Sequence, residues 1–194
     1  LATAAEGHAD NAAAAVYGGL CVVADVRGEP RAVRIEPPED LLAALYIPDK
    51  HLSTAAMRAA LPKSVPFGDA VHNVGAAALA VAALSQGRLD LLAAGTVDRL
   101  HEPYRAAAYP ELPELIEIAL AAGAKGACMS GAGPTVIAFS DDVAAAATIA
   151  AAMERRAQEL DMTGRAAVQA ARGQGAYVVK PAGASSDGAS LPLA

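Results

Sequence analysis

The chain has 194 residues, of which 54% are hydrophobic and 19% are charged, and its net charge is −6. A negative net charge without a long Lys/Arg run excludes the attraction on which nucleic-acid and anionic-membrane partners depend, and no stretch approaches the apolar length of a membrane span. Much of the apolar count is alanine, which favours helices but buries little area per residue. We therefore expect a helix-rich protein that acts on small molecules.

The predicted elements alternate between helices and strands. Asp10 is placed to cap a short helix that Gly18 and Gly19 end. The later elements are strands at 20–25 and 31–35 around a turn at 27–30, a strand at 41–47, helices at 53–61, 67–86, 89–101 and 114–121, paired strands at 127–129 and 136–139, a helix at 143–160 and a strand at 176–179. The helix-flanked hairpin near the end favours an α+β fold over an α/β fold.

The two cysteines, Cys21 and Cys128, lie in separate apolar runs. Neither has a Cys-x-x-Cys spacing or a nearby Cys/His cluster, so the sequence predicts two buried thiols and no zinc site. No signal-peptide pattern opens the sequence, which favours a reducing, cytoplasmic setting. The sequence begins in what looks like the middle of a helix and without Met, so we expect residues upstream.

The turn between the strands at 127–129 and 136–139 consists of small residues. Two interpretations stay open for it. Its backbone amides are accessible and suit a nest that holds phosphate, but a lone glycine-rich turn is equally typical of a tight hairpin. The residues at issue are Ser130, Gly131, Ala132 and Gly133.

A second polar cluster precedes the first helix. His8, Asp10 and Asn11 supply an acid/base group, a hydrogen-bond acceptor and an amide that both donates and accepts. This combination suits recognition of a polar ligand at a helix entrance. The alternative is structural, with Asp10 as an ordinary N-cap and His8 on the surface.

Four segments together resemble homoserine kinases, a family of the GHMP small-molecule kinase superfamily. They are residues 6–11 with the following Gly18-Gly19, residues 53–62, residues 98–105 and residues 126–134. Their order along the chain makes the resemblance more specific than one glycine loop. Residues 188–194 are similar to the tail of actinobacterial members. The resemblance implies the helix-backed antiparallel sheet of the GHMP C-terminal domain.

The resemblance implies ATP-dependent phosphorylation of the L-homoserine side-chain hydroxyl, with ATP and Mg²⁺ as cofactors, on the route to threonine. It places His8, Asp10, Asn11, Arg58 and Arg105 around the amino-acid substrate, and Asn11 at the reacting hydroxyl. Arginine forks pair bidentately with a carboxylate, which suits that role. Alone, Arg58 would be a solvated helix charge and Arg105 the partner of a nearby glutamate.

The same resemblance places ATP phosphates at Ser130, Gly131, Ala132 and Gly133. The family's main phosphate loop and its Mg²⁺-binding acidic residue would fall upstream of residue 1, so we expect no metal ligands in this chain and little activity from it alone. The expected domains are 1–38, the remainder of an N-terminal domain, 39–181, the C-terminal domain, and 182–194, a mobile tail. The family implies a homodimer. The alternatives are a noncatalytic amino-acid-binding regulatory domain and a GHMP kinase for another small hydroxyl substrate.

Overall fold

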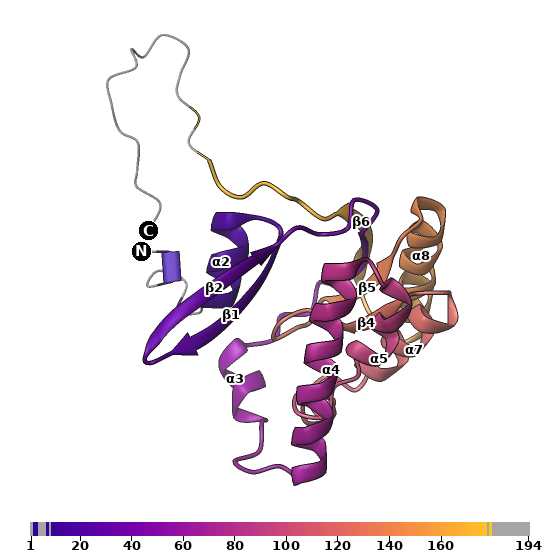
Figure 1. Cartoon of the computed structure of the whole chain (residues 1–194). Helices are drawn as coiled ribbons and strands as arrows, with labels where there is room; N and C mark the ends of the chain where they lie inside the picture. Colours follow the sequence, from indigo (N-terminus) through magenta and orange to yellow (C-terminus); the bar gives the residue numbers. More distant parts are fainter. Residues whose placement is uncertain (1, 4–6, 8, 178, 180–194) are drawn as a thin grey trace.

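The computed structural model describes residues 2–3, 7, 9–177 and 179, so the predicted tail at 182–194 and the actinobacterial-like segment at 188–194 lie outside the described residues. Figure 1 shows the arrangement of the elements. In chain order they are α2 (Ala9–Tyr17), β1 (Leu20–Val26), β2 (Glu29–Ile35), β3 (Leu42–Pro48), α3 (Thr54–Ala59), α4 (Phe67–Gln86), the 3₁₀ turn η1 (Leu89–Leu91), α5 (Leu92–Gly95), α6 (Glu102–Arg105), α7 (Leu112–Ala121), β4 (Gly126–Met129), β5 (Val136–Ser140), α8 (Val143–Glu159) and β6 (Gly164–Ala170).

The strands form two antiparallel sheets, which confirms the α+β class. β1 and β2 form a two-stranded sheet whose turn at Arg27-Gly28 has positive φ at both residues and is closed by a bond from the Gly28 amide to Asp25 Oδ1 (2.8 Å). The other four strands are ordered β4-β5-β3-β6. The predicted border at 38/39 falls in the connection between the two sheets.

Helices cover both faces of the four-stranded sheet, because alternate residues of a strand point to opposite faces. Val136 and Ala138 of β5 are fully buried in a core shared with α7 and α8. Phe139, between Ala138 and Ser140, instead packs against Leu41, Ala83 and Leu92 on the face that α4 and α5 cover. Figure 1 shows α4 and the α7–α8 pair on the two sides of this sheet.

The helix predicted at 89–101 is wrong beyond residue 95. α5 ends at Gly95, and the Thr96 hydroxyl donates to the Leu92 carbonyl (2.9 Å). The Asp98 carboxylate then accepts backbone bonds from residues 100 to 102, which turns the chain away from the helix axis. Side chains that bond nearby backbone groups compete with helix in this way.

Residues 176, 177 and 179 of the strand predicted at 176–179 are not in a strand, and residue 178 lies outside the described residues. The last strand among the described residues is β6, which pairs with β3 along its whole length. It was missed because its run Gly-Arg-Ala-Ala-Val-Gln-Ala holds one β-branched residue and no clear alternation. Of the described residues there, Ala176 donates its amide to the Ala15 carbonyl (3.0 Å), so this segment meets α2 rather than the sheet.

Helix α4 corrects the expectation about apolar length. By length and composition it is able to cross a membrane, and 11% of its most apolar window is buried. Its exposed large apolar side chains are Phe67, Val71, Val74 and Val81. The bounds of α4 agree with the predicted helix at 67–86.

Candidate functional site

Helix α2 carries the first predicted substrate segment. Its first turn contains Asp10 and Asn11, both exposed. The backbone N–H of Asn11 donates to Asp10 Oδ1 (2.8 Å). Asp10 therefore lies within the first turn instead of capping it. The predicted ligand His8 lies outside the described residues. Gly18 and Gly19 end the helix with positive φ values of 66° and 68°, as predicted.

Helix α3 carries Arg58 in its last turn. Ser53 caps the helix by accepting a bond from the Ala56 amide at Oγ (3.4 Å), which confirms the predicted cap. Met57 is buried, so the helix is anchored by that side chain while the neighbouring Arg58 lies exposed. The cap and the buried methionine thus fix the helix that presents the arginine.

A carboxylate-centred turn follows α5. Asp98 Oδ1 accepts from Asn73 Nδ2 (2.6 Å) and the Leu100 amide (3.0 Å), and Oδ2 accepts from the His101 amide (2.7 Å) and the Glu102 amide (2.6 Å). Burial alone would raise the pKa of Asp98, but these bonds outweigh it and hold the pKa below its ordinary value. The charged carboxylate therefore organises the turn that leads into α6.

The short helix α6 bonds to the glycine loop at both of its ends. Glu102 Oε1 accepts from the Met129 amide (2.6 Å), and Arg105 Nη1 donates to the Gly131 carbonyl (3.0 Å). Burial, together with the negative charge of Asp98, raises the pKa of Glu102 despite the bond from Met129. The two bonds join residues that lie 26 positions apart (Arg105 and Gly131) and 27 positions apart (Glu102 and Met129) in the sequence.

Arg105 is buried, with 7% of the residue exposed, unlike the surface arginine that its sequence context allowed. The described residues provide no hydrogen-bond partner for its Nε, which is itself fully buried. An unsatisfied buried donor is costly unless something else accepts its bond. Nε is therefore a buried donor without an acceptor among the described residues.

The glycine loop connects β4 to β5 as a tight hairpin turn, so the hairpin interpretation is correct for its backbone. The Ser130 amide donates to the Thr135 carbonyl (2.8 Å), and the Gly133 amide donates to the Ser130 carbonyl (2.9 Å). Among the described residues, the amides of Gly131 and Ala132 have no partner. Successive unpaired amides are also what a phosphate nest requires, so hairpin and nest are compatible here.

Gly133 has a steric role in this loop. Its φ is 82°, and a Cβ there would lie 2.7 Å from Met129 Sδ. A larger residue would have to displace the Met129 thioether and to adopt a positive φ that side chains rarely allow.

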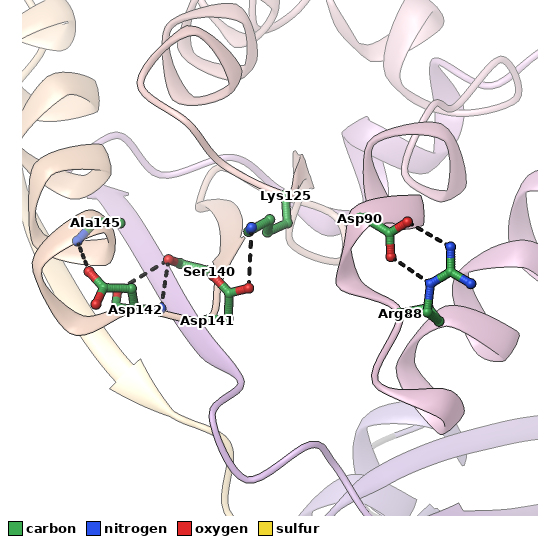
Figure 2. A network of polar contacts seen from close by, with 7 residues as sticks. All are labelled: Arg88, Asp90, Lys125, Ser140, Asp141, Asp142 and Ala145. Carbon is green, nitrogen blue, oxygen red and sulfur yellow. Dashed lines mark hydrogen bonds and ion pairs between the residues drawn. The ribbon is translucent and has the colours of Figure 1, made fainter.

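The opposite end of the same hairpin is fixed by polar contacts (Figure 2). Lys125 Nζ pairs with Asp141 Oδ2 (3.2 Å), and the buried Ser140 hydroxyl donates to the Asp142 carbonyl (3.1 Å). Asp142 Oδ1 caps α8 by accepting from the Ala145 amide (2.7 Å), while Arg88 and Asp90 form a separate exposed pair at η1. These contacts set the strand ends so that the turn at 130–133 stands at the other end of the hairpin.

Comparison with known proteins identifies the domain that carries this loop. Residues 80–159 match the family model for the GHMP kinases C terminal region. This part of the chain is similar to the GHMP kinase C-terminal domain. The matched range includes α7, β4, β5 and α8.

Relatives of this chain are named homoserine kinase. The protein of Caldicellulosiruptor saccharolyticus is 44% identical over 142 residues, which is 73% of this chain and 46% of that protein. The protein of Streptomyces avermitilis is 46% identical over 145 residues, 75% of this chain and 47% of that protein. The chain spans about half the length of the curated relatives it matches.

A solved structure of a homoserine kinase from Cytophaga hutchinsonii superposes on this chain with a TM-score of 0.82 at 30% identity. The superposition covers 87% of this chain and 53% of that one. It reaches well beyond the GHMP match at 80–159, so the likeness in fold also includes other parts of the chain.

The structure joins two of the predicted site segments, because Arg105 and the loop at 130–133 are in contact. Two open cavities, of about 420 and 490 Å³, lie beside α2, and none of the predicted site residues that the structure describes is among their lining residues. The site is therefore a surface assembled around α6 and the loop.

Two residues of this assembly were missed by sequence reasoning. Asp98 and Glu102 lie in the segment at 98–105 that the family resemblance singled out, but their bonds to backbone amides were not foreseen. A carboxylate just before a short helix is a signal for such a cap, and Asp98 has it. Glu102 has no local signal, because its partner Met129 is distant in sequence.

Proposed function

We propose that this chain supplies the amino-acid-binding side and the second phosphate loop of a homoserine kinase. The reaction is transfer of the γ-phosphoryl group of ATP to the side-chain hydroxyl of L-homoserine, which gives O-phospho-L-homoserine on the route to threonine. The observation that carries the proposal is the buried Arg105, which bonds the glycine loop and keeps an unpartnered Nε. Arg105 thereby places a positive charge that can bind a carboxylate beside a loop that suits phosphate.

The role of Arg105 follows from its geometry. Nη1 donates to the Gly131 carbonyl, and we assign the other terminal nitrogen, Nη2, to the substrate carboxylate. A hydrogen bond that involves a charged group in a partly buried site is stronger and shorter than a hydrogen bond between two neutral groups. Arg58, exposed on α3, is the second arginine that we assign to the carboxylate end. His8 and Asp10 complete the proposed set.

The glycine loop holds phosphate in this proposal. The Gly131 and Ala132 amides are the donors, because the amides of Ser130 and Gly133 already close the turn. Phosphoryl transfer needs positioning and charge stabilisation more than covalent help from the protein. A loop fixed by Glu102 and Arg105 at its two sides supplies such positioning without reorganisation.

Asn11 orients the hydroxyl. An amide cannot take a proton, so Asn11 accepts or donates a hydrogen bond and the proton leaves late, with the phosphate as its acceptor. Replacing Asn11 by Asp would introduce a base at the same place. A rate that survives Asn11→Asp shows that a base is tolerated, and a collapse supports the orienting role.

Among the described residues, no group of three or more His, Cys, Asp or Glu side chains could hold a metal ion. Mg²⁺ with ATP is implied by the family, and we assign no step of the reaction through the ion to this chain. The homodimer is also a proposal, which sedimentation of the protein tests.

The test combines substrate binding with phosphotransfer. L-Homoserine binding is measured by calorimetry on the 194-residue chain. Phosphotransfer from ATP to L-homoserine is followed by ³¹P NMR with the protein purified from its native cells. Arg105→Met should abolish measurable binding, since a buried charge-assisted contact is lost. Arg99→Met is the matched control, because Arg99 is exposed and pairs with Asp69 (3.5 Å). Equal L-homoserine affinity in both variants would refute the proposal.

A further inference from the structure

The segment after β6 crosses the helix that carries Asn11. Figure 1 shows the chain leaving β6 and running past the α2 end of the β1–β2 sheet. We propose that residues 171–176, here named the strap, hold α2 in position for the substrate, and that Arg34 is the positioning residue that fixes the strap to the helix. The link to the substrate rests on the proposed function.

Backbone bonds attach the strap to both sides of the α2–β1 turn. The Gly19 amide donates to the Arg172 carbonyl (2.7 Å), and the Ala176 amide donates to the Ala15 carbonyl (3.0 Å). The last turn of α2 and the residue that precedes β1 are thus both bonded to the strap. Carbonyls in the last turn of a helix have no partner within the helix, so an external donor is stabilising there.

The guanidinium of Arg34 spans the helix and the strap. Nε donates to the Tyr17 carbonyl at the end of α2 (3.2 Å), and Nη2 donates to the Gly173 carbonyl in the strap (2.6 Å). Glu36 Oε2 pairs with the same Nη2 (2.7 Å) and keeps the side chain in this orientation. A cation at a helix C-terminus also interacts favourably with the helix dipole.

The crossing is too close for side chains. A Cβ on Gly175 would lie 2.1 Å from the Val16 carbonyl oxygen, and one on Gly18 would lie 2.4 Å from the Gly175 nitrogen. The two backbones are therefore in direct contact, which glycine alone permits. Such a contact leaves the end of α2 little room to shift relative to the strap.

The consequence lies at the other end of the helix. α2 has nine residues, so a tilt at Tyr17 moves the first turn that holds Asp10 and Asn11. The helix is otherwise anchored by the buried Ala12 and Ala13, whose small side chains fix its angle poorly. The strap supplies the constraint that these alanines lack, and the orientation of Asn11 depends on it.

The experiment removes the guanidinium group of Arg34. It measures the hydrogen exchange of α2 and the kinetics with L-homoserine separately. In Arg34→Met, amide hydrogen exchange of residues 9–17 should accelerate about five- to tenfold, and kcat/KM for L-homoserine should fall by about the same factor, the range expected for coupled sites. Part of this fall should be in kcat, because Asn11 orients the reacting hydroxyl. Arg34→Lys keeps the charge but cannot span two carbonyls, so it should fall between wild type and Arg34→Met.

Arg31→Met is the matched control, since Arg31 lies on the same strand, is exposed and pairs only with Glu29 among the described residues. If hydrogen exchange in α2 is equal in the Arg34 and Arg31 variants, the proposal that the strap holds α2 is refuted. Faster exchange with an unchanged kcat/KM overturns the positioning role. If wild type neither binds nor phosphorylates L-homoserine, the proposed function fails, and the exchange measurement still decides the strap. Should Arg34→Met not fold, Arg34→Lys answers the same questions.

Discussion

The Asp98 carboxylate is the centre on which the α6 segment depends, and its replacement by asparagine is a sharp test. Each carboxylate oxygen accepts two bonds, one pair from Asn73 and Leu100 and the other from His101 and Glu102. Asparagine keeps one oxygen and presents an NH₂ group in place of the other. In either orientation of the amide, two donors lose their acceptor and face another donor.

The magnitude follows from those two lost bonds. A hydrogen bond to a charged group contributes about 1.5–3 kcal/mol to stability, and the lower value suits a half-buried side chain such as Asp98. We therefore expect Asp98→Asn to lower the free energy of unfolding by about 3 kcal/mol at pH 7. Because the turn presents α6, the Glu102 and Arg105 contacts with the glycine loop should loosen as well.

Urea unfolding at two pH values tests this reasoning. The pKa of Asp98 is lower in the folded chain than its ordinary value of 3.8, so its contribution is present above about pH 4 and is lost as pH falls through the folded pKa. The difference between wild type and Asp98→Asn should thus shrink at pH 3. Asp90→Asn, at an exposed carboxylate paired with Arg88, is the control and should leave the midpoint unchanged. A difference at pH 7 below about 1 kcal/mol, or one that is equal at both pH values, refutes the argument.

Three further outcomes are expected. Glu102→Ala leaves the buried Met129 amide without its acceptor and should cost about 1–3 kcal/mol in urea unfolding, while Glu102→Gln retains an acceptor oxygen and should cost less. Tyr109→Phe removes a buried hydroxyl with no partner among the described residues, so the unfolding midpoint should stay or rise, and a clear fall would contradict this. Burial raises the pKa of Cys128 to about 12, so its alkylation by iodoacetamide at pH 8 should be about a hundredfold or more slower than in urea, and equal rates would show an accessible thiolate.

The elements that sequence reasoning predicted correctly are those with local signals. α4 has a helical pattern over its whole length and ends at Gly87, whose φ of 67° suits a helix C-terminus. The β1–β2 hairpin is marked by the apolar run of β1 and by the glycine turn that follows it. The signals that specify such elements lie within about twenty residues of sequence. The apolar pattern and the capping residues were therefore enough to predict them.

The failures occurred where tertiary partners decide the structure. β6 contains mostly small residues and becomes a strand because β3 offers it a full ladder of backbone bonds. The segment 96–101 has helical composition in part, but Asp98 and Asn73 hold it as a turn, and Asn73 comes from α4. Neither the edge of β3 nor the position of α4 can be deduced from those short segments.

The candidate site shows the same division. The family resemblance assigned Arg105 to the substrate and the loop at 130–133 to phosphate, and the structure places the two in contact. The resemblance did not show how they are joined, because the donor and acceptor atoms come from segments that meet only after α7 and β4 have packed. The relation of Asn11 and Arg58 to this contact is still a prediction.

Arg105 explains why contact between the two segments matters for the chemistry. A lysine has a single ammonium group, so binding the Gly131 carbonyl would compete with binding a ligand. The planar guanidinium separates these tasks, with Nη1 on the loop and Nη2 as the nitrogen that we assign to the ligand. Movement of a ligand carboxylate bound by that group would be transmitted to the Gly131 backbone. The amino-acid end and the phosphate loop would then be aligned by one side chain.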